Sequence, residues 1–329
     1  MRYNCRNSAH TSQDDERMTR KLPKFVATSV VRGSGQGESH GGVFLVDFDK
    51  QEVEQHVDWN TSEDDFKGRS GDRSLRGIAF SDEEILIAAS DVLVHCDRSF
   101  KIKTFSRNYY LSDCREICRY EQTIFLTSPG FDCLLAFDLD TGKYIWGFQL
   151  IRQYDRWAGH TFDPLSNKGP VPVNDYHLNM VHVDSTGIYL SGLRTNALLH
   201  LDSKMKVSEV CSLPAGAHNA RPYRDGILFN DTESNCVRYV GRDDKNIAFK
   251  IATYDDADIE FAGIDDSNIA RQGFGRGLCP VGDRFVAGGS SPSTVSLYDL
   301  HSNQKVGSVN LSMDIRNAIH GLEVWPYDD

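Results

Sequence analysis

Short runs of alternating apolar and polar residues recur in groups along the chain. The first group reads RGIAF at 76–80, ILIAAS at 85–90 and VLVHCD at 92–97, and a fourth strand-like run follows it. Alternation with a period of two is typical of half-buried β-strands. Groups of four such strands at intervals of roughly 40 residues are typical of propeller blades. The pattern therefore predicts five complete blades, over residues 76–107, 115–150, 177–212, 218–253 and 276–312.

The two ends of the chain supply the parts of one further blade. Residues 320–325 read as a lone inner strand, whereas residues 25–31, 42–48 and 52–59 read as three strands without an inner one. Joining them removes the open sheet edges that invite aggregation. We therefore expect an all-β chain folded as a six-bladed β-propeller, with one blade closed by both chain termini. A flexible N-terminal tail at residues 1–22 is expected to precede a single propeller domain at 23–329.

Composition narrows the class of protein. The chain has 329 residues, is 40% hydrophobic and carries a net charge of −11, so we expect a large core and no nucleic-acid partner. The absence of an apolar run of about 18 residues predicts no membrane partner. The eight cysteines are scattered through apolar runs and read as reduced thiols. Together with a polar N-terminus that lacks a secretory signal pattern, they predict a cytoplasmic location. The oligomeric state stays open.

Loop lengths indicate where a site should lie. The connections at 151–176 and 254–275 are long and rich in Asp, Gly, Asn and Pro, and both come before a predicted inner strand. Long loops in compact domains are usually functional. We therefore expect these two segments to be lids on the face where the inner strands begin.

Each predicted inner strand opens with a histidine or an arginine. A propeller directs the start of every inner strand toward one central channel, so these six side chains should converge. They are Arg76, Arg115, His177, His218, Arg276 and His320.

Three arginines around a channel need an anionic partner, because arginine keeps its charge at neutral pH. That partner is either a bound oxyanion or an internal acid such as Glu116 or Glu323. If it is a small anionic or aromatic substrate, the candidate binding residues are Arg76, Arg115, Arg276 and His320, with His40 from the GESHGG loop.

The most specific motifs lie in the third and fourth complete blades. Asp175, His177 and Asn179 form a DYHLN segment, and Arg194 follows it in SGLRTN. His218 then opens the next blade, which continues into the turn FND at 229–231. Over these residues the chain resembles the bacterial arylsulfate sulfotransferases, which carry a related Asp-aromatic-His-Asn strand, an arginine segment and a histidine-initiated next blade.

This resemblance implies a mechanism residue by residue. His218 stands where the family places a nucleophilic histidine that accepts a sulfuryl group from an aryl ester. His177, Asn179 and Arg194 stand where the family stabilises the sulfuryl oxygens and moves protons. No metal or other cofactor is implied. The chain departs from the family at Arg115, where the family has a histidine, and arginine cannot act as a general acid or base.

Two other interpretations remain open from the residues themselves. His177, His218 and His320 could surround one divalent metal ion on the propeller axis, which would suit a metal-dependent lyase or oxygenase. Alternatively, the channel residues pair with one another and the chain is a non-catalytic ligand-binding or protein-interaction propeller.

Overall fold

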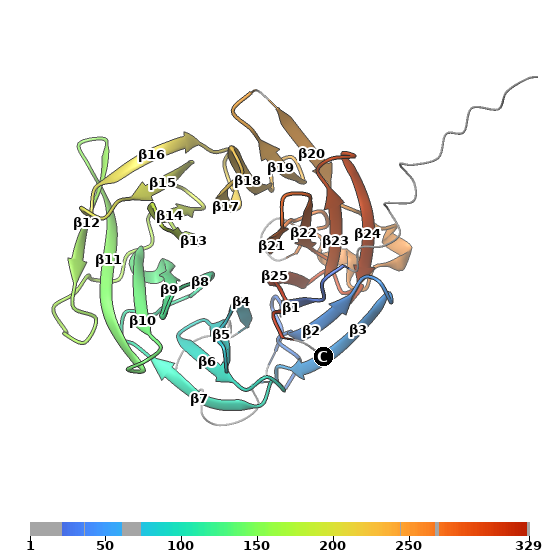
Figure 1. Cartoon of the computed structure of the whole chain (residues 1–329). Helices are drawn as coiled ribbons and strands as arrows, with labels where there is room; N and C mark the ends of the chain where they lie inside the picture. The colour runs from blue at the N-terminus through green and yellow to red at the C-terminus, as the bar shows by residue number, and fades with distance from the viewer. Residues whose placement is uncertain (1–21, 36, 61–73, 244, 267–269, 328–329) are drawn as a thin grey trace, which may run out of the picture.

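Six antiparallel sheets stand around a common axis in the computed structural model, which describes residues 22–35, 37–60, 74–243, 245–266 and 270–327. Figure 1 shows the sheets as the blades of a ring, with the first strand of each blade nearest the centre. The described residues form strands and three short 3-10 helices, and no α-helix occurs among them. The prediction of an all-β, six-bladed β-propeller is confirmed.

Five of the blades have four strands each, and in four of these the strands follow one another in the sequence from the axis outward. The blade that follows the N-terminal strands contains β4 (Leu75–Phe80), β5 (Ile85–Ala89), β6 (Val92–Cys96) and β7 (Ile102–Arg107). Another contains β13 (Leu178–Asp184), β14 (Gly187–Gly192), β15 (Ala197–Leu201) and β16 (Val207–Ser212). The next contains β17 (His218–Tyr223), β18 (Gly226–Asp231), β19 (Cys236–Val240) and β20 (Asn246–Lys250). The last contains β21 (Leu278–Val281), β22 (Phe285–Ser290), β23 (Thr294–Asp299) and β24 (Gln304–Asn310).

One blade has a fifth strand that the sequence pattern did not predict. It contains β8 (Ile117–Tyr120), β9 (Thr123–Ser128), β10 (Cys133–Asp138), β11 (Lys143–Gln153) and β12 (Arg156–Phe162). The expectation that 151–176 is wholly a lid loop was therefore wrong. Strand β12 pairs with β11 at the outer edge, with Gly147 opposite Phe162. A Cβ at Gly147 would lie 2.4 Å from the Phe162 ring, so the glycine is what lets this strand cover the edge.

The remaining blade joins the two ends of the described chain. It contains β25 (Asn317–Val324), β1 (Phe25–Val31), β2 (Gly42–Asp47) and β3 (Glu52–Asp58), in that order from the axis. Phe25 pairs with Val324, and β1 and β25 lie side by side in Figure 1. This confirms that both termini close one blade. Apart from Leu22, the tail predicted at 1–22 lies outside the described residues.

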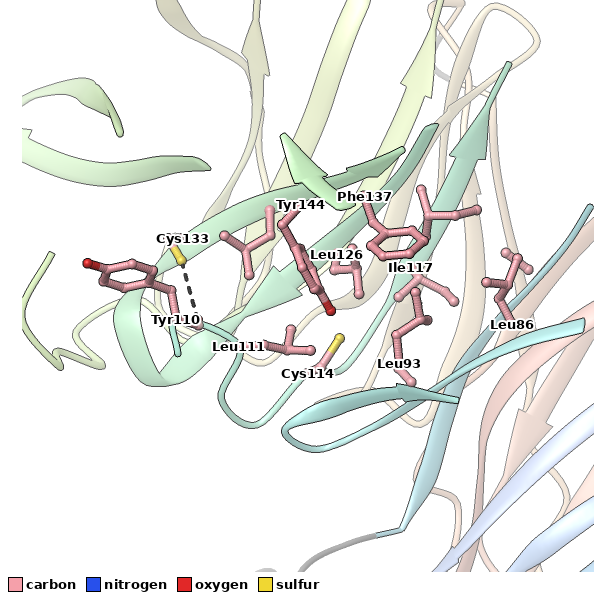
Figure 2. Packing of buried hydrophobic residues seen from close by; sticks show 14 of the residues in the cluster. Leu86, Leu93, Tyr110, Leu111, Cys114, Ile117, Leu126, Cys133, Phe137 and Tyr144 are labelled. Atoms are coloured by element: carbon pink, nitrogen blue, oxygen red, sulfur yellow. Dashed lines mark hydrogen bonds between the residues drawn. The ribbon is translucent and has the colours of Figure 1, made fainter. Parts of the chain in front are cut away.

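The hydrophobic core lies between neighbouring blades. All seven residues of β1 are buried, whereas six of the seven residues of β3 on the outer edge are exposed. Figure 2 shows one interblade cluster, in which Leu86 and Leu93 face Ile117 and Phe137 of the next blade. Burying a side chain of this size stabilises the fold by about 1.5–3 kcal/mol. Because each blade buries its faces against two neighbours, the inner strands are held firmly in position.

Two of the three short 3-10 helices lie in the predicted lid segment 254–275. They are η4 (Asp256–Asp258) and η5 (Ala262–Ile264). The third, η3 (Pro129–Phe131), lies between β9 and β10. Among the residues that the structure describes, no helix has the length and apolar character needed to cross a membrane.

Candidate functional site

A small polar cavity lies on the propeller axis, where the inner strands begin. Its volume is about 20 Å³, and its lining combines six of the predicted site residues with Glu116 and Asn219. The six are Arg115, His177, Asn179, His218, Arg276 and His320. A cavity of this size holds about one water molecule or one oxygen atom of a larger group. Residues from five different blades therefore meet at one point.

Irregular backbone at the start of the inner strands directs these side chains to the axis. His177 and Asn219 have left-handed φ values of 53° and 55°, and the ladders shift register between Leu178 and Met180 and between His218 and Arg221. Such β-bulges insert one extra residue and re-aim the side chains beside it. The backbone N–H groups of Tyr176 and His177 also donate to the carboxylate of Asp132 in the preceding blade, at 3.0 and 2.9 Å. Asp132 thus fixes the segment that carries His177.

Asp113 forms ion pairs with two of the three predicted channel arginines, Arg76 and Arg115. Its carboxylate oxygens lie 2.6 Å from Arg76 Nη1 and 2.7 Å from Arg115 Nη2. Burial acts to raise the pKa of Asp113, but the charges of Arg115 and Arg76 lower it to about 2. Arg76 is fully buried beside Asp113 and is not among the residues that line the cavity. Arg115 keeps one side on the cavity, so it remains a candidate for anion contact.

Arg276 lies next to His320 and to an aromatic ring. Its Nη1 is 3.0 Å from His320 Nε2, and its guanidinium stacks over Phe274 at 4.7 Å from the ring centroid. Because a guanidinium only donates, His320 Nε2 must accept, and the imidazole is neutral. Burial and then the charge of Arg276 lower the pKa of His320 well below its usual range. The pair therefore carries a single positive charge toward the cavity.

His218 and His177 are also neutral imidazoles with defined orientations. The Nδ1 atom of His218 donates to the Gly216 carbonyl at 2.7 Å, which leaves Nε2 unprotonated. Burial, followed by the charge of Arg276, lowers the pKa of His218 well below its usual range. The Nδ1 atom of His177 lies 3.1 Å from Asn174 Oδ1. Burial and the charge of Arg115 lower the pKa of His177 to about 4.

A chain of amides crosses the axis below the histidines. Asn230 donates to Asn219 at 3.0 Å, and Asn219 donates to Glu116 at 2.8 Å. Burial raises the pKa of Glu116 to about 8, against the opposing charge of Arg221. The glutamate is therefore largely uncharged at neutral pH. Asn219 and Asn230 were missed by sequence reasoning, since the bulge after His218 turns Asn219 to the axis without any trace in the alternating pattern.

Asn179 has unmet hydrogen-bonding capacity. The side chain is 6% exposed, and neither its amide nitrogen nor its amide oxygen has a hydrogen-bond partner within the described ranges. A buried polar group left unsatisfied costs about 1–3 kcal/mol. The amide lines the axial cavity, so a molecule held there would satisfy it.

Two further predicted residues lie outside the cavity. Arg194 is exposed, and its guanidinium donates to the Asp175 carbonyl at 2.6 Å and to Asn174 Oδ1 at 3.1 Å. It therefore supports the segment that leads into His177. His40 is buried between β1 and β2, with Nδ1 2.7 Å from Ser34 Oγ, and does not line the cavity either.

The histidines do not form a metal site in this arrangement. In the part of the chain that the structure describes, no three His, Cys, Asp or Glu side chains are grouped closely enough to hold a metal ion. The nearby charges of Arg115 and Arg276 would also repel a cation. This arrangement of donors and charges does not favour the divalent ion on the axis, which stays a prediction.

Comparison with known proteins identifies the fold class. No family model matches the sequence, and no curated protein matches it either. Among solved structures, the chain is similar to one in a nidogen/laminin complex, with a TM-score of 0.59, 9% identity, and coverage of 92% of this chain and 98% of that one. It is also similar to a protein of unknown function from Bacteroides caccae, with a TM-score of 0.57, 9% identity, and coverage of 93% and 100%. At such identities the likeness shows the fold alone.

The fold and the cavity together define a six-bladed β-propeller with a polar axial site. A streptogramin B lyase structure is a more distant match, at a TM-score of 0.42, 13% identity and 69% coverage of each chain. None of the comparisons supports the arylsulfate sulfotransferase family in particular.

Proposed function

We propose that the axial cavity binds the oxyanion group of a small anionic or aromatic substrate. The observation that carries this proposal is the meeting of Arg115, Arg276 and the unsatisfied amide of Asn179 at one buried point. Charged and amide donors of this kind are what bind sulfate, phosphate and carboxylate oxygens. A volume of about 20 Å³ admits an oxygen of the anion, while the body of the substrate lies on the partly exposed rim beside His177.

We further propose that the bound group is a sulfuryl ester and that His218 is the nucleophile. The unprotonated Nε2 of His218 attacks sulfur, the bond between sulfur and the aryl oxygen breaks, and the aryloxide leaves and takes up a proton from water where its basicity requires one. The acceptor hydroxyl then attacks sulfur, the bond between sulfur and Nε2 breaks, and the hydroxyl proton is lost. A neutral imidazole is a competent nucleophile near pH 7.

The surrounding residues suit this two-step transfer. The hydrogen bond from His218 Nδ1 to the Gly216 carbonyl strengthens as positive charge develops on the attacking ring. Arg115 and Arg276 stabilise charge on the transferred group, as cationic groups do in phosphoryl transfer. His177 is neutral and can accept the proton of the acceptor hydroxyl. Arg194 acts as a positioning residue for His177.

The test is turnover of 4-nitrophenyl sulfate with phenol as acceptor. We expect wild type to release nitrophenolate and His218→Ala to lose at least about 100-fold in rate. His200→Ala, at a half-buried position of β15 that does not line the cavity, should match wild type. Absence of wild-type turnover would overturn sulfuryl transfer.

Calorimetry with inorganic sulfate separates binding from catalysis. We expect Asn179→Ala and Arg276→Gln to weaken sulfate binding at least about 10-fold. Sulfate binding without turnover would assign the chain to the non-catalytic ligand-binding propellers. Failure of wild type to bind sulfate would overturn the anion site itself.

A further inference from the structure

A second and larger cavity lies at the opposite end of the inner strands. Its volume is about 290 Å³. Ile117, Val181 and Glu323 line it, and each follows an axial-site residue along its own inner strand, after Arg115, Asn179 and His320. The two cavities are therefore separated by the layer of Asn219 and Glu116.

Arg221 of β17 is the unusual residue of this second cavity. The side chain is 9% exposed, and no hydrogen bond or ion pair to it is found among the residues described. Its Nε atom is buried without a partner. Burying a guanidinium without an acceptor is costly, because the charge loses its hydration.

The two nearby internal acids form no ion pair with Arg221. Neither Glu116 nor Glu323 has an oxygen within the 4.0 Å that defines an ion pair with it. Glu116 accepts from Asn219, and Glu323 accepts from the Cys279 thiol at 3.7 Å. Burial raises the pKa of both carboxyls, that of Glu116 to about 8. At neutral pH Glu116 is thus mostly uncharged, and Glu323, which also lines the cavity, makes no ion pair with the guanidinium.

Arg119 lines the same cavity and behaves differently. Its guanidinium donates to the Phe80 carbonyl at 3.1 Å, to the Glu121 carbonyl at 2.8 Å and to Gln122 at 3.1 Å. Its Nη1 also pairs with the Asp82 carboxylate at 3.3 Å. All four partners belong to the protein, so Arg119 is a structural cation. The contrast singles out Arg221 as the group that needs an acceptor from elsewhere.

We propose that this second cavity binds the carboxylate of a small and otherwise apolar acid, with Arg221 as the carboxylate ligand. The guanidinium fork matches the two oxygens of a planar carboxylate. Arg119, Cys118, His182 and Glu323 also line the cavity, and the apolar part of its wall suits a ring or a short aliphatic chain. That apolar part is formed by Ile78, Ala79, Phe80, Ile117, Val181 and Val183. The volume is close to the roughly 300 Å³ at which small-molecule pockets begin.

The test compares benzoate with its neutral isostere benzamide by isothermal titration calorimetry. We expect benzoate to bind wild type and benzamide to bind at least about 10-fold more weakly, because only the carboxylate pairs with Arg221. Arg221→Gln should abolish this preference, Arg221→Lys should weaken it, and Arg119→Gln should retain it. Equal binding of the two ligands, or an unchanged preference in Arg221→Gln, would overturn the proposal.

A second measurement keeps the test decisive if Arg221→Gln fails to fold. His182 lines this cavity, whereas His218 lines the axial one. In wild type, benzoate should shift the imidazole NMR signals of His182 and leave those of His218 unchanged. The reverse pattern, or loss of benzoate binding in Asn179→Ala, would place benzoate in the axial cavity and overturn the second site. The outcome does not depend on sulfate binding or sulfate ester turnover.

Discussion

Asn219 donates a 2.8 Å hydrogen bond to Glu116 across the axial cavity. The two residues are 103 positions apart in the sequence and belong to different blades. The bond lies between the two cavities and holds a carboxyl group whose pKa burial raises to about 8. A protonated carboxyl group, that of Glu116, therefore lies between two cavities that each have arginine in their lining.

The unfolding free energy should depend on pH because of Glu116. The unfolded chain ionises this carboxyl near the ordinary value of 4.5, whereas the fold keeps it protonated until about pH 8. The folded state thus binds more protons between these values, and its stability falls as pH rises through that window. Glu116→Gln should remove this loss. Relative to wild type, the variant should gain more than about 1.4 kcal/mol in unfolding free energy between pH 5 and pH 9.

Urea denaturation at pH 5, 7 and 9 checks this expectation. Glu209→Gln, an exposed site on β16, is the matched control and should follow wild type at each pH. A pH profile of Glu116→Gln parallel to that of wild type would show that the buried carboxyl does not hold its proton.

Replacing Asp113 should destabilise the fold more than replacing any other acid near the axis. Asp113 forms an ion pair with both Arg76 and Arg115, and Arg76 is fully buried. Breaking a buried ion pair on one side costs about 3–5 kcal/mol, because the remaining charge is uncompensated. We therefore expect Asp113→Asn to lower the unfolding free energy at pH 7 by that amount, as measured by chemical denaturation.

The stability difference between wild type and Asp113→Asn should also depend on pH, in a defined direction. The pKa of Asp113 is about 2 in the fold, below its ordinary value of 3.8, so its stabilisation is complete above pH 4 and is lost as pH falls toward 2. The difference between wild type and Asp113→Asn should shrink over that range. A difference that stays constant from pH 5 to pH 2 would contradict this account.

The fold followed from the sequence more fully than the site did. Periodic strands and the lone inner strand near the C-terminus were enough to predict the blades and the closure of β1 against β25. Strand β12 was missed because it covers a glycine at an outer edge, where alternation is weak. The convergence of His177 and His218 was predictable from topology, but the inward turn of Asn219 depends on a bulge.

Charge pairing was the other feature that sequence reasoning could not supply. Asp113 precedes Arg115 by two residues, and nothing in that spacing shows that it also reaches Arg76 on the neighbouring blade. Similarly, Arg221 and Arg119 look alike as residues on inner strands. Both line the second cavity, and only the contacts show that Arg119 is hydrogen-bonded by the protein whereas the Nε atom of Arg221 has no partner among the described residues.

Asp132 should be required to position His177. It is fully buried and accepts hydrogen bonds from the backbone N–H groups of Tyr176 and His177. In Asp132→Asn one oxygen becomes an NH₂ donor that faces these N–H groups. We expect a loss of about 1–3 kcal/mol in unfolding free energy, measured by urea denaturation, with Asp140→Asn on an exposed turn as the unaffected control. Equal stability of the two variants would contradict the role given to Asp132.

Anion binding should change the protonation of His177. Without an anion, burial and the charge of Arg115 keep the pKa of this imidazole at about 4, so it is neutral at pH 7. An oxyanion beside the ring adds negative potential and favours the imidazolium, so saturating sulfate should raise the pKa by at least about one unit. NMR titration of the imidazole signals measures this shift, and His200, which is half-buried on β15 and does not line the cavity, serves as the internal control. In Arg276→Gln, which removes an anion ligand, the shift should require at least about 10-fold more sulfate. A pKa of His177 that does not change with sulfate would place the anion elsewhere.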